Sequence, residues 1–226
     1  EHLVMATENG IVKKTNLSEF CNSRAGGIIA IEVEEGDKLM GVKLTTGPSD
    51  VMLITRQGMS IRFNEGQLRD QGHSTVGVWG IDLAKDDRVE SLEVVEANAT
   101  LLVITENGYG KRTDFEEYRA QTRGGKGVIT IKTTERNGEV VGAHTVHDND
   151  AVMLITSQGQ MIRMPVSDIR TIGRNTQGVR LINLDEGDKL VSATTVEPEN
   201  DEAEGSAGEG EGKAPEETGS PEAGKA

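Results

Sequence analysis

One pattern recurs four times along this chain and limits the folds that are open to it. In each copy an apolar run ends at a turn that closes with glycine, and these glycines lie 48, 50 and 51 residues apart: Gly10, Gly58, Gly108 and Gly159. Two further columns keep the same period: Gly27, Gly77, Gly127 and Gly178, each followed four residues later by Ile, and Leu39, Val89, Val140 and Leu190. Columns in register indicate one supersecondary unit used repeatedly. A unit of about 50 residues is typical of a propeller-like array.

The content of one unit predicts strands. The runs 51–55, 101–105 and 152–156 are unbroken and apolar, which is expected of strands covered on both faces. After the turn, Met59, Ile61 and Phe63 alternate with Ser60 and Arg62, which predicts a strand with one face toward solvent. In the next segment we expect Ile29, Ile31 and Val33 to share one face. We therefore expect an all-β fold with four four-stranded blades, at 1–46, 47–96, 97–147 and 148–197.

Composition and charge bound the rest of the chain. Net charge is −14, and residues 198–226 hold nine acidic and two basic residues with no apolar side chain larger than Ala. This segment cannot offset the entropy of folding, so we expect a disordered acidic tail that competes with anionic ligands for the cations of the body. No membrane span or signal peptide is evident, which favours a cytoplasmic protein. Because the chain begins at Glu1 without Met, we expect a fragment of a longer protein.

Basic residues recur at fixed places in the repeat. Four residues past each turn glycine stand Lys14, Arg62, Arg112 and Arg163, with Lys13 and Lys111 beside two of them. A propeller would place these at equivalent radii, as an electrostatic track for a phosphate backbone. The alternative interpretation is an ordinary solvated strand face.

Loop cations precede the second glycine of three repeats: Arg24, Arg123 with Lys126, and Arg174. The loop Gln121-Thr122-Arg123-Gly124-Gly125-Lys126-Gly127 is the sharpest case. Because its three glycines have no side chains, the backbone amides and the two cations of this loop can approach a phosphate together. A basic Gly-rich loop alone can equally be a flexible turn.

Other chemistry finds little support in the sequence. His144 and His147 would fall on opposite faces of a strand, and the single Cys21 excludes a cysteine-based zinc site. No phosphate-loop motif or nucleophile elbow occurs. We therefore expect neither catalytic residues nor a metal or cofactor in this chain, and we expect Trp79 to be core or rim packing.

The sequence closely resembles the family of C-terminal domains of the A subunit of bacterial DNA gyrase. The resemblance is carried by the segments 107–113, 126–129, 134–138 and 173–179, and it covers residues 1–197. It implies a β-pinwheel of six blades that exchange strands, of which four would be present here. Residues 121–127 resemble the box motif of that family, but Thr122 stands where a cation is usual and the loop lies in the third repeat.

The resemblance implies a function in DNA wrapping. The domain would bend duplex DNA without sequence preference and support negative supercoiling by a type IIA topoisomerase. That enzyme would be a heterotetramer that joins the rest of the gyrase A subunit to the gyrase B subunit, and it would use ATP and Mg²⁺ through other domains. The rival interpretations are the C-terminal domain of the A subunit of topoisomerase IV, a protein-interaction propeller and, last, a propeller enzyme.

Overall fold

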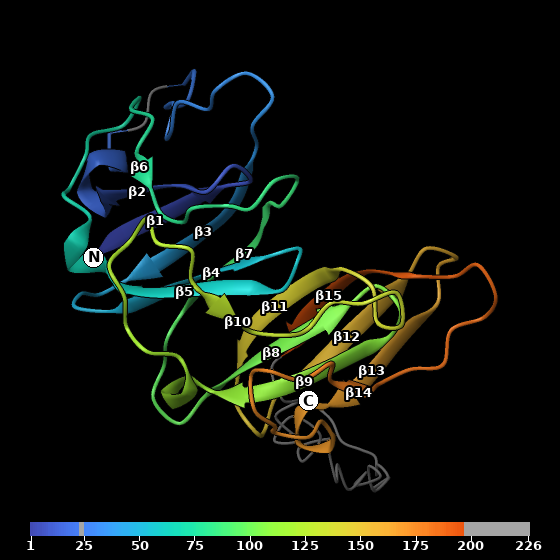
Figure 1. Cartoon of the computed structure of the whole chain (residues 1–226). Coiled ribbons are helices and arrows are strands. Elements are labelled where there is room, and N and C mark those ends of the chain that lie inside the picture. Colours follow the sequence, from blue (N-terminus) through green and yellow to red (C-terminus); the bar gives the residue numbers. More distant parts are fainter. Residues whose placement is uncertain (23–24, 197–226) are drawn as a thin grey trace, which may run out of the picture.

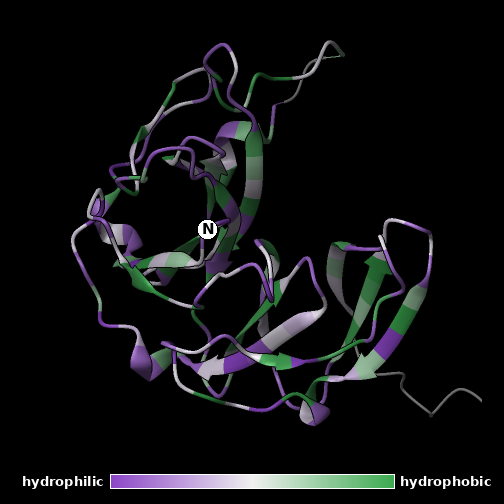
Figure 2. Cartoon of the chain, turned by 45° about the vertical axis from the view of Figure 1, so that its right-hand side comes forward, coloured by the Kyte–Doolittle hydropathy of each residue, from purple (hydrophilic) through white to green (hydrophobic). Residues whose placement is uncertain are grey.

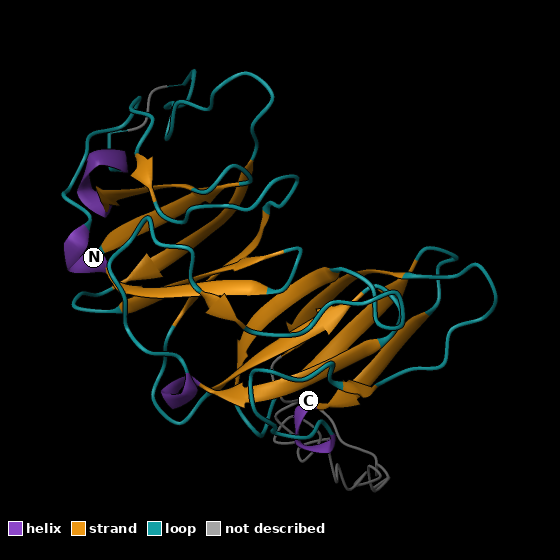
Figure 3. Cartoon of the chain, in the orientation of Figure 1, coloured by secondary structure: helices purple, strands orange, loops and turns teal. Residues whose placement is uncertain are grey.

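The structure is a computed structural model that describes residues 1–22 and 25–196. Arg24 and the acidic segment 198–226, both named above, lie outside these residues. The described part is built from strands, joined by loops and by short 3₁₀ turns of three or four residues (Figures 1 and 3). None of its helices has the length and apolar character needed to cross a membrane.

The elements follow the repeats in order. They are β1 (His2–Thr7), β2 (Ile11–Asn16), η1 (Leu17–Phe20), β3 (Leu39–Thr45), β4 (Asp50–Thr55), β5 (Met59–Asn64), η2 (Glu65–Gln67), β6 (Val78–Trp79), β7 (Val89–Val94), β8 (Thr100–Thr105), β9 (Tyr109–Asp114), η3 (Phe115–Glu117), β10 (Val128–Ile129), β11 (Val140–Val146), β12 (Ala151–Thr156), β13 (Met161–Pro165), η4 (Val166–Asp168), β14 (Val179–Arg180) and β15 (Leu190–Val196).

The strands form four sheets, which are the blades. Their orders are β3-β1-β2-β6, β7-β4-β5-β10, β11-β8-β9-β14 and β15-β12-β13. Strands β3, β7, β11 and β15 contact one another in series and form the hub, so β6, β10 and β14 lie at the outer edge. The propeller-like arrangement expected from the repeats is confirmed, with three four-stranded blades and a fourth that has three strands among the described residues.

Blades exchange strands along the chain. The two-residue strand β10 follows β9 of the third repeat, yet it pairs with β5 of the second blade, where Val128 lies opposite Ser60. In the same way β6 of the second repeat pairs with β2, and β14 of the fourth pairs with β9. Each of the first three blades is therefore completed by the repeat that follows it.

The core lies between neighbouring blades. Along β4, Val51 and Leu53 pack in the cluster shared with the first blade, while Met52 and Ile54 pack in the cluster shared with the third. All four side chains are fully buried. The apolar runs are therefore strands covered on both faces, as expected, and hydrophobic residues concentrate on the strands in Figure 2. The repeated strands thus bury apolar area at every junction between blades. Each Å² of apolar area removed from water stabilises the fold by roughly 25 cal/mol.

Two of the local expectations are wrong. Ser60 is fully buried and the Arg62 side chain is 21% exposed, because the loop of the third repeat covers the face of β5 that was expected to meet solvent. In the first repeat Ile31 is buried, but Ile29 is 67% exposed and Val33 is exposed as well. The equivalent segments of the later repeats leave the ladder after two residues, so alternation does not continue along them.

The turn glycines are fixed by backbone conformation. Gly10, Gly58, Gly108 and Gly159 have φ between 81° and 85°. A β-carbon at Gly58 would lie 2.2 Å from the carbonyl oxygen of Ile131, so the turn also needs glycine for space.

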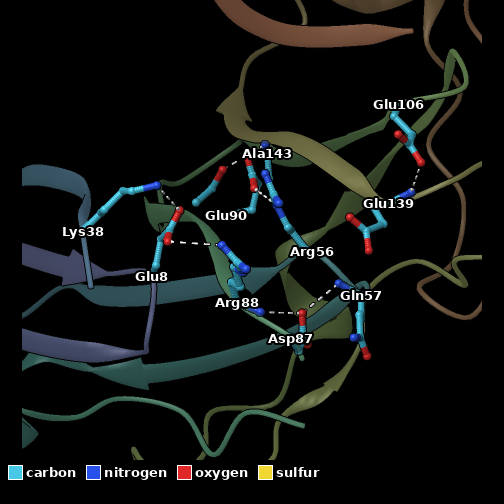
Figure 4. Close-up of polar contacts among 11 residues, drawn as sticks. Glu8, Lys38, Arg56, Gln57, Asp87, Arg88, Glu90, Glu106, Glu139 and Ala143 are labelled. Atoms are coloured by element: carbon cyan, nitrogen blue, oxygen red, sulfur yellow. Dashed lines mark hydrogen bonds and ion pairs between the residues drawn. The ribbon is translucent and has the colours of Figure 1, made fainter. Parts of the chain in front are cut away.

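Charge complementarity marks the blade junctions at the turn ends (Figure 4). Glu8 faces Arg88 of the second blade at 3.6 Å, and Glu106 accepts from Lys189 of the fourth at 2.7 Å. At the junction between them the signs are reversed, because Arg56 of the second blade is attracted by Glu139 of the third. Arg56 also donates to Glu90 of its own blade at 2.9 Å. The bond to Glu90 raises the pKa of Arg56, while burial raises the pKa of Glu90.

The Glu106–Lys189 pair can be tested by a double-mutant cycle with Glu106→Gln and Lys189→Gln. Both side chains are partly exposed, at 24% and 55%, so we expect a coupling free energy of only about 0.5 kcal/mol. Urea unfolding at low and high salt would measure it, and the coupling should shrink with salt. A coupling near zero at low salt would show that this pair contributes nothing to the junction.

Candidate nucleic-acid interface

The strand cations hold the loop of the following repeat. Arg62 Nε donates to Asp50 at 2.8 Å, and its Nη1 donates to the carbonyls of Phe115 at 2.8 Å and Tyr118 at 3.3 Å. Equivalent contacts are made by Lys14 with Asp70 and by Arg112 with Asp148 and the carbonyl of Ile169. These charges are used inside the fold. The expectation that the column presents available cations is therefore wrong for Lys14, Arg62 and Arg112.

Lys13 and Lys111 are fully buried. Lys13 Nζ donates to the carbonyl of Ala30 at 2.6 Å, and Lys111 Nζ donates to the carbonyls of Gly173 and Arg174 at 2.7 and 2.5 Å. Burial lowers the pKa of both lysines, that of Lys111 to about 8. Neither ammonium can reach a ligand outside the protein, so their expected role as phosphate contacts is wrong. They fasten a Gly-containing loop to a blade instead.

The fourth member of the column, Arg163, differs from the other three in its exposure to solvent. Arg163 lies on β13, opposite Met153 of β12, and is exposed. This strand is the outer strand of the fourth blade among the described residues.

The loop arginines sit at the outer edge. Arg123 Nη1 donates to the carbonyl of Trp79 on β6 at 3.0 Å, and Arg174 Nη1 donates to the carbonyl of Ile129 on β10 at 3.0 Å. Each arginine therefore caps the outer strand supplied by the preceding repeat. Both residues are partly exposed, and Lys126 next to them is exposed. The structure thus brings Arg123 and Arg174 of the expected site to equivalent places on the outer edge, and Lys126 lies in the same loop as Arg123.

The loop of residues 121–127 is built as a tight turn. Gly124 has φ of 76° and donates its amide to the carbonyl of Gly80 at 2.7 Å, and the carbonyl of Gly125 accepts from the amide of Asp82 at 3.0 Å. Gln67 binds the loop from the second repeat, through the amide of Arg123 at 2.9 Å. The amides of Gln121, Arg123 and Gly124 are thus engaged with protein, while Arg123 is partly exposed and Lys126 is exposed.

Two further arginines at the outer edge were missed by sequence reasoning. Arg180 occupies the β14 position that is Ile29, Trp79 and Ile129 in the other repeats, and it is exposed. Arg136 lies nearby in the loop 133–139, also exposed. The break in an otherwise apolar column was a signal for Arg180. Trp79 itself is 61% exposed, so of its two expected places the rim is correct and the core is not.

Comparison with known proteins agrees with the repeats. Residues 1–46, 49–96, 99–147 and 150–197 match the family model described as DNA gyrase C-terminal domain, beta-propeller. The chain belongs to the DNA gyrase C-terminal domain family. Among curated proteins, the DNA gyrase A subunit of Salmonella typhimurium is 48% identical over 215 residues, which are 93% of this chain and 24% of that protein. The DNA gyrase A subunit of Haloquadratum walsbyi is 44% identical over 92% of this chain.

Solved structures of gyrase-type C-terminal domains share the fold. The C-terminal domain of DNA topoisomerase IV superposes with a TM-score of 0.82 at 26% identity, covering 87% of this chain and 62% of that one. The DNA gyrase A C-terminal domain gives 0.78 at 26%, covering 86% and 65%. The chain spans about a quarter of the length of the curated relatives it matches.

Proposed function

We propose that this member of the gyrase C-terminal domain family binds duplex DNA without sequence preference along the outer edge of its blades and bends it. The observation that carries the proposal is the recurrence of a loop arginine on successive outer strands, at Trp79 and at Ile129. Lys126 and Arg163 add exposed charge on this edge. A convex row of cations suits phosphates, because spaced backbone contacts offset the several kcal/mol that bending a duplex costs.

Exchange of both loop arginines tests the proposal. For Arg123→Gln/Arg174→Gln we expect weaker binding of duplex DNA and a slope of log affinity against log salt that is less steep by about 2, because each neutralised phosphate contributes about 0.9. A matched control, Lys38→Gln/Lys189→Gln, removes the same charge next to the hub strands β3 and β15. Equal slopes for the two double variants would contradict the proposed surface.

Trp79 gives an independent readout of the same edge. It is the single tryptophan of the chain and its side chain is exposed. Bound DNA should shield it, so acrylamide quenching of its fluorescence is expected to decrease in the complex. Unchanged quenching at saturating DNA would place the ligand elsewhere.

The function of the whole protein is proposed from its relatives, which are named as the A subunit of DNA gyrase. In it this domain would support ATP-dependent negative supercoiling by a heterotetramer with the gyrase B subunit, with ATP and Mg²⁺ held by other domains. A role in topoisomerase IV has less support, because the curated relatives at 44–48% identity are gyrase proteins while the topoisomerase IV structure is 26% identical.

A further inference from the structure

Two arginines converge on one phenol at the outer edge of the third blade. Arg136 Nε donates to the hydroxyl of Tyr109 at 3.3 Å, and Arg180 donates to the same oxygen through Nη2 at 2.7 Å and Nε at 3.3 Å. The carbon centres of the two guanidinium groups lie 5.0 and 5.2 Å from the ring centroid. Cation–π attraction and the shared oxygen therefore hold two positive groups close together.

The three residues come from separate segments. Tyr109 opens β9, Arg180 lies opposite it on β14, and Arg136 reaches over from the loop before β11. The Tyr109 residue is 3% exposed, whereas both arginines are exposed. Asn183 fixes Arg180 further by accepting from Nη1 at 3.1 Å. The strand exchange thus presents two oriented guanidinium groups on a rigid base.

Their charge has no carboxylate partner among the described residues. The contacts of Arg136 in this part of the chain run through Nε, so its two Nη groups remain available as donors. The hydrogen bonds from Arg180 and then Arg136 lower the pKa of Tyr109, which reflects the positive field at this point. Two cations held together in this way favour an anion, and a guanidinium group matches a phosphate through paired donors.

We propose that Arg136 and Arg180, oriented by Tyr109, form a clamp for one phosphate group of the DNA backbone. The choice of DNA as the source of this phosphate rests on the function proposed above. The clamp continues the edge occupied by Arg123 at Trp79 and Arg174 at Ile129, because Arg180 stands at the next equivalent position of an outer strand. Here the outer strand itself provides the cation.

Selective tyrosine labelling tests the clamp directly. The chain has two tyrosines, and Tyr118 is buried with its hydroxyl 2.6 Å from Thr130, so ¹³Cζ-tyrosine NMR contains an internal control. Inorganic phosphate and a short duplex, each compared with chloride at equal ionic strength, should move the Tyr109 resonance and leave that of Tyr118 in place. Arg180→Ile, the residue found at Ile129, should abolish the shift.

DNA affinity gives the second readout. Arg180→Ile and Arg136→Gln should each make the salt slope less steep by about 1, while Lys85→Gln, in the equivalent turn of the second repeat, should not. If wild-type protein binds DNA but Tyr109 responds to neither ligand, the clamp is wrong and the proposed function stands. A response to phosphate but not to bound duplex overturns the DNA assignment. Failure of wild-type protein to retain DNA at low salt contradicts the proposed function itself.

Discussion

Alanine at Gly127 is expected to lower the free energy of unfolding by about 2–5 kcal/mol and to release β10 from the second blade. Gly127 has φ of 76°, which costs a residue with a β-carbon roughly 1–2 kcal/mol. The added carbon would also lie 2.2 Å from the carbonyl oxygen of Ser60, and relieving such an overlap costs about 1–3 kcal/mol more. Urea unfolding would measure the loss, and hydrogen exchange of the Thr130 amide would report on β10 locally.

The chain contains a matched control for this change. Gly27 occupies the same column in the first repeat with φ of 77°, but a β-carbon there meets nothing within 4 Å. Gly27→Ala should therefore show the conformational cost alone. If the two variants lose equal stability, contact across the exchanged strand is not what requires glycine at position 127.

Alanine at Lys111 is expected to destabilise the domain by about 3–5 kcal/mol. The change leaves the carbonyls of Gly173 and Arg174 without their donor in a buried site, and it opens a cavity where a long side chain was packed. Thr176 Oγ1, 3.1 Å from Nζ, loses a partner as well. Chemical unfolding and hydrogen exchange across 173–176 would measure the global and local effects.

Lys13 separates hydrogen bonding from packing at this position. It is also fully buried at the equivalent place in the first blade, but its Nζ has the carbonyl of Ala30 as its described acceptor. Lys13→Ala should therefore cost less than Lys111→Ala, and Lys111→Met, which keeps most of the volume, should recover part of the loss. Equal losses at Lys13 and Lys111 would show that the cavity alone sets the cost.

Repetition made most of the fold predictable. An unbroken apolar run, as at 51–55, has both faces covered, and the structure divides its residues between two junctions. The Ile column is buried in all four repeats, at Ile31, Ile81, Ile131 and Ile182. Strand exchange did not follow from these patterns, because periodicity assigns residues to faces but not to a partner strand. It was expected from the family resemblance alone.

The candidate site was harder to predict for a related reason. Alternation indicated that Arg62 points away from the core, but not that the loop after Phe115 covers that side. Lys13 and Lys111 occupy a position that is Ile61 and Ile162 in the other repeats, and this mixture signals a buried site that either side chain can fill. Arg123 and Arg174 could be placed because glycine columns keep their loops in register. The meeting of Arg136 with Arg180 depends on exchange and lies outside any single repeat.

The exchange of outer strands between blades has a mechanical consequence. A pull on β10 passes through its ladder to β5 and through the backbone to β11, which belong to different blades. A force applied at the outer edge thus reaches two neighbouring sheets at once. Removing one repeat at its sequence boundaries would leave its own blade absent and the preceding blade without its last strand, so the repeat is a unit of sequence but not a unit that can be excised.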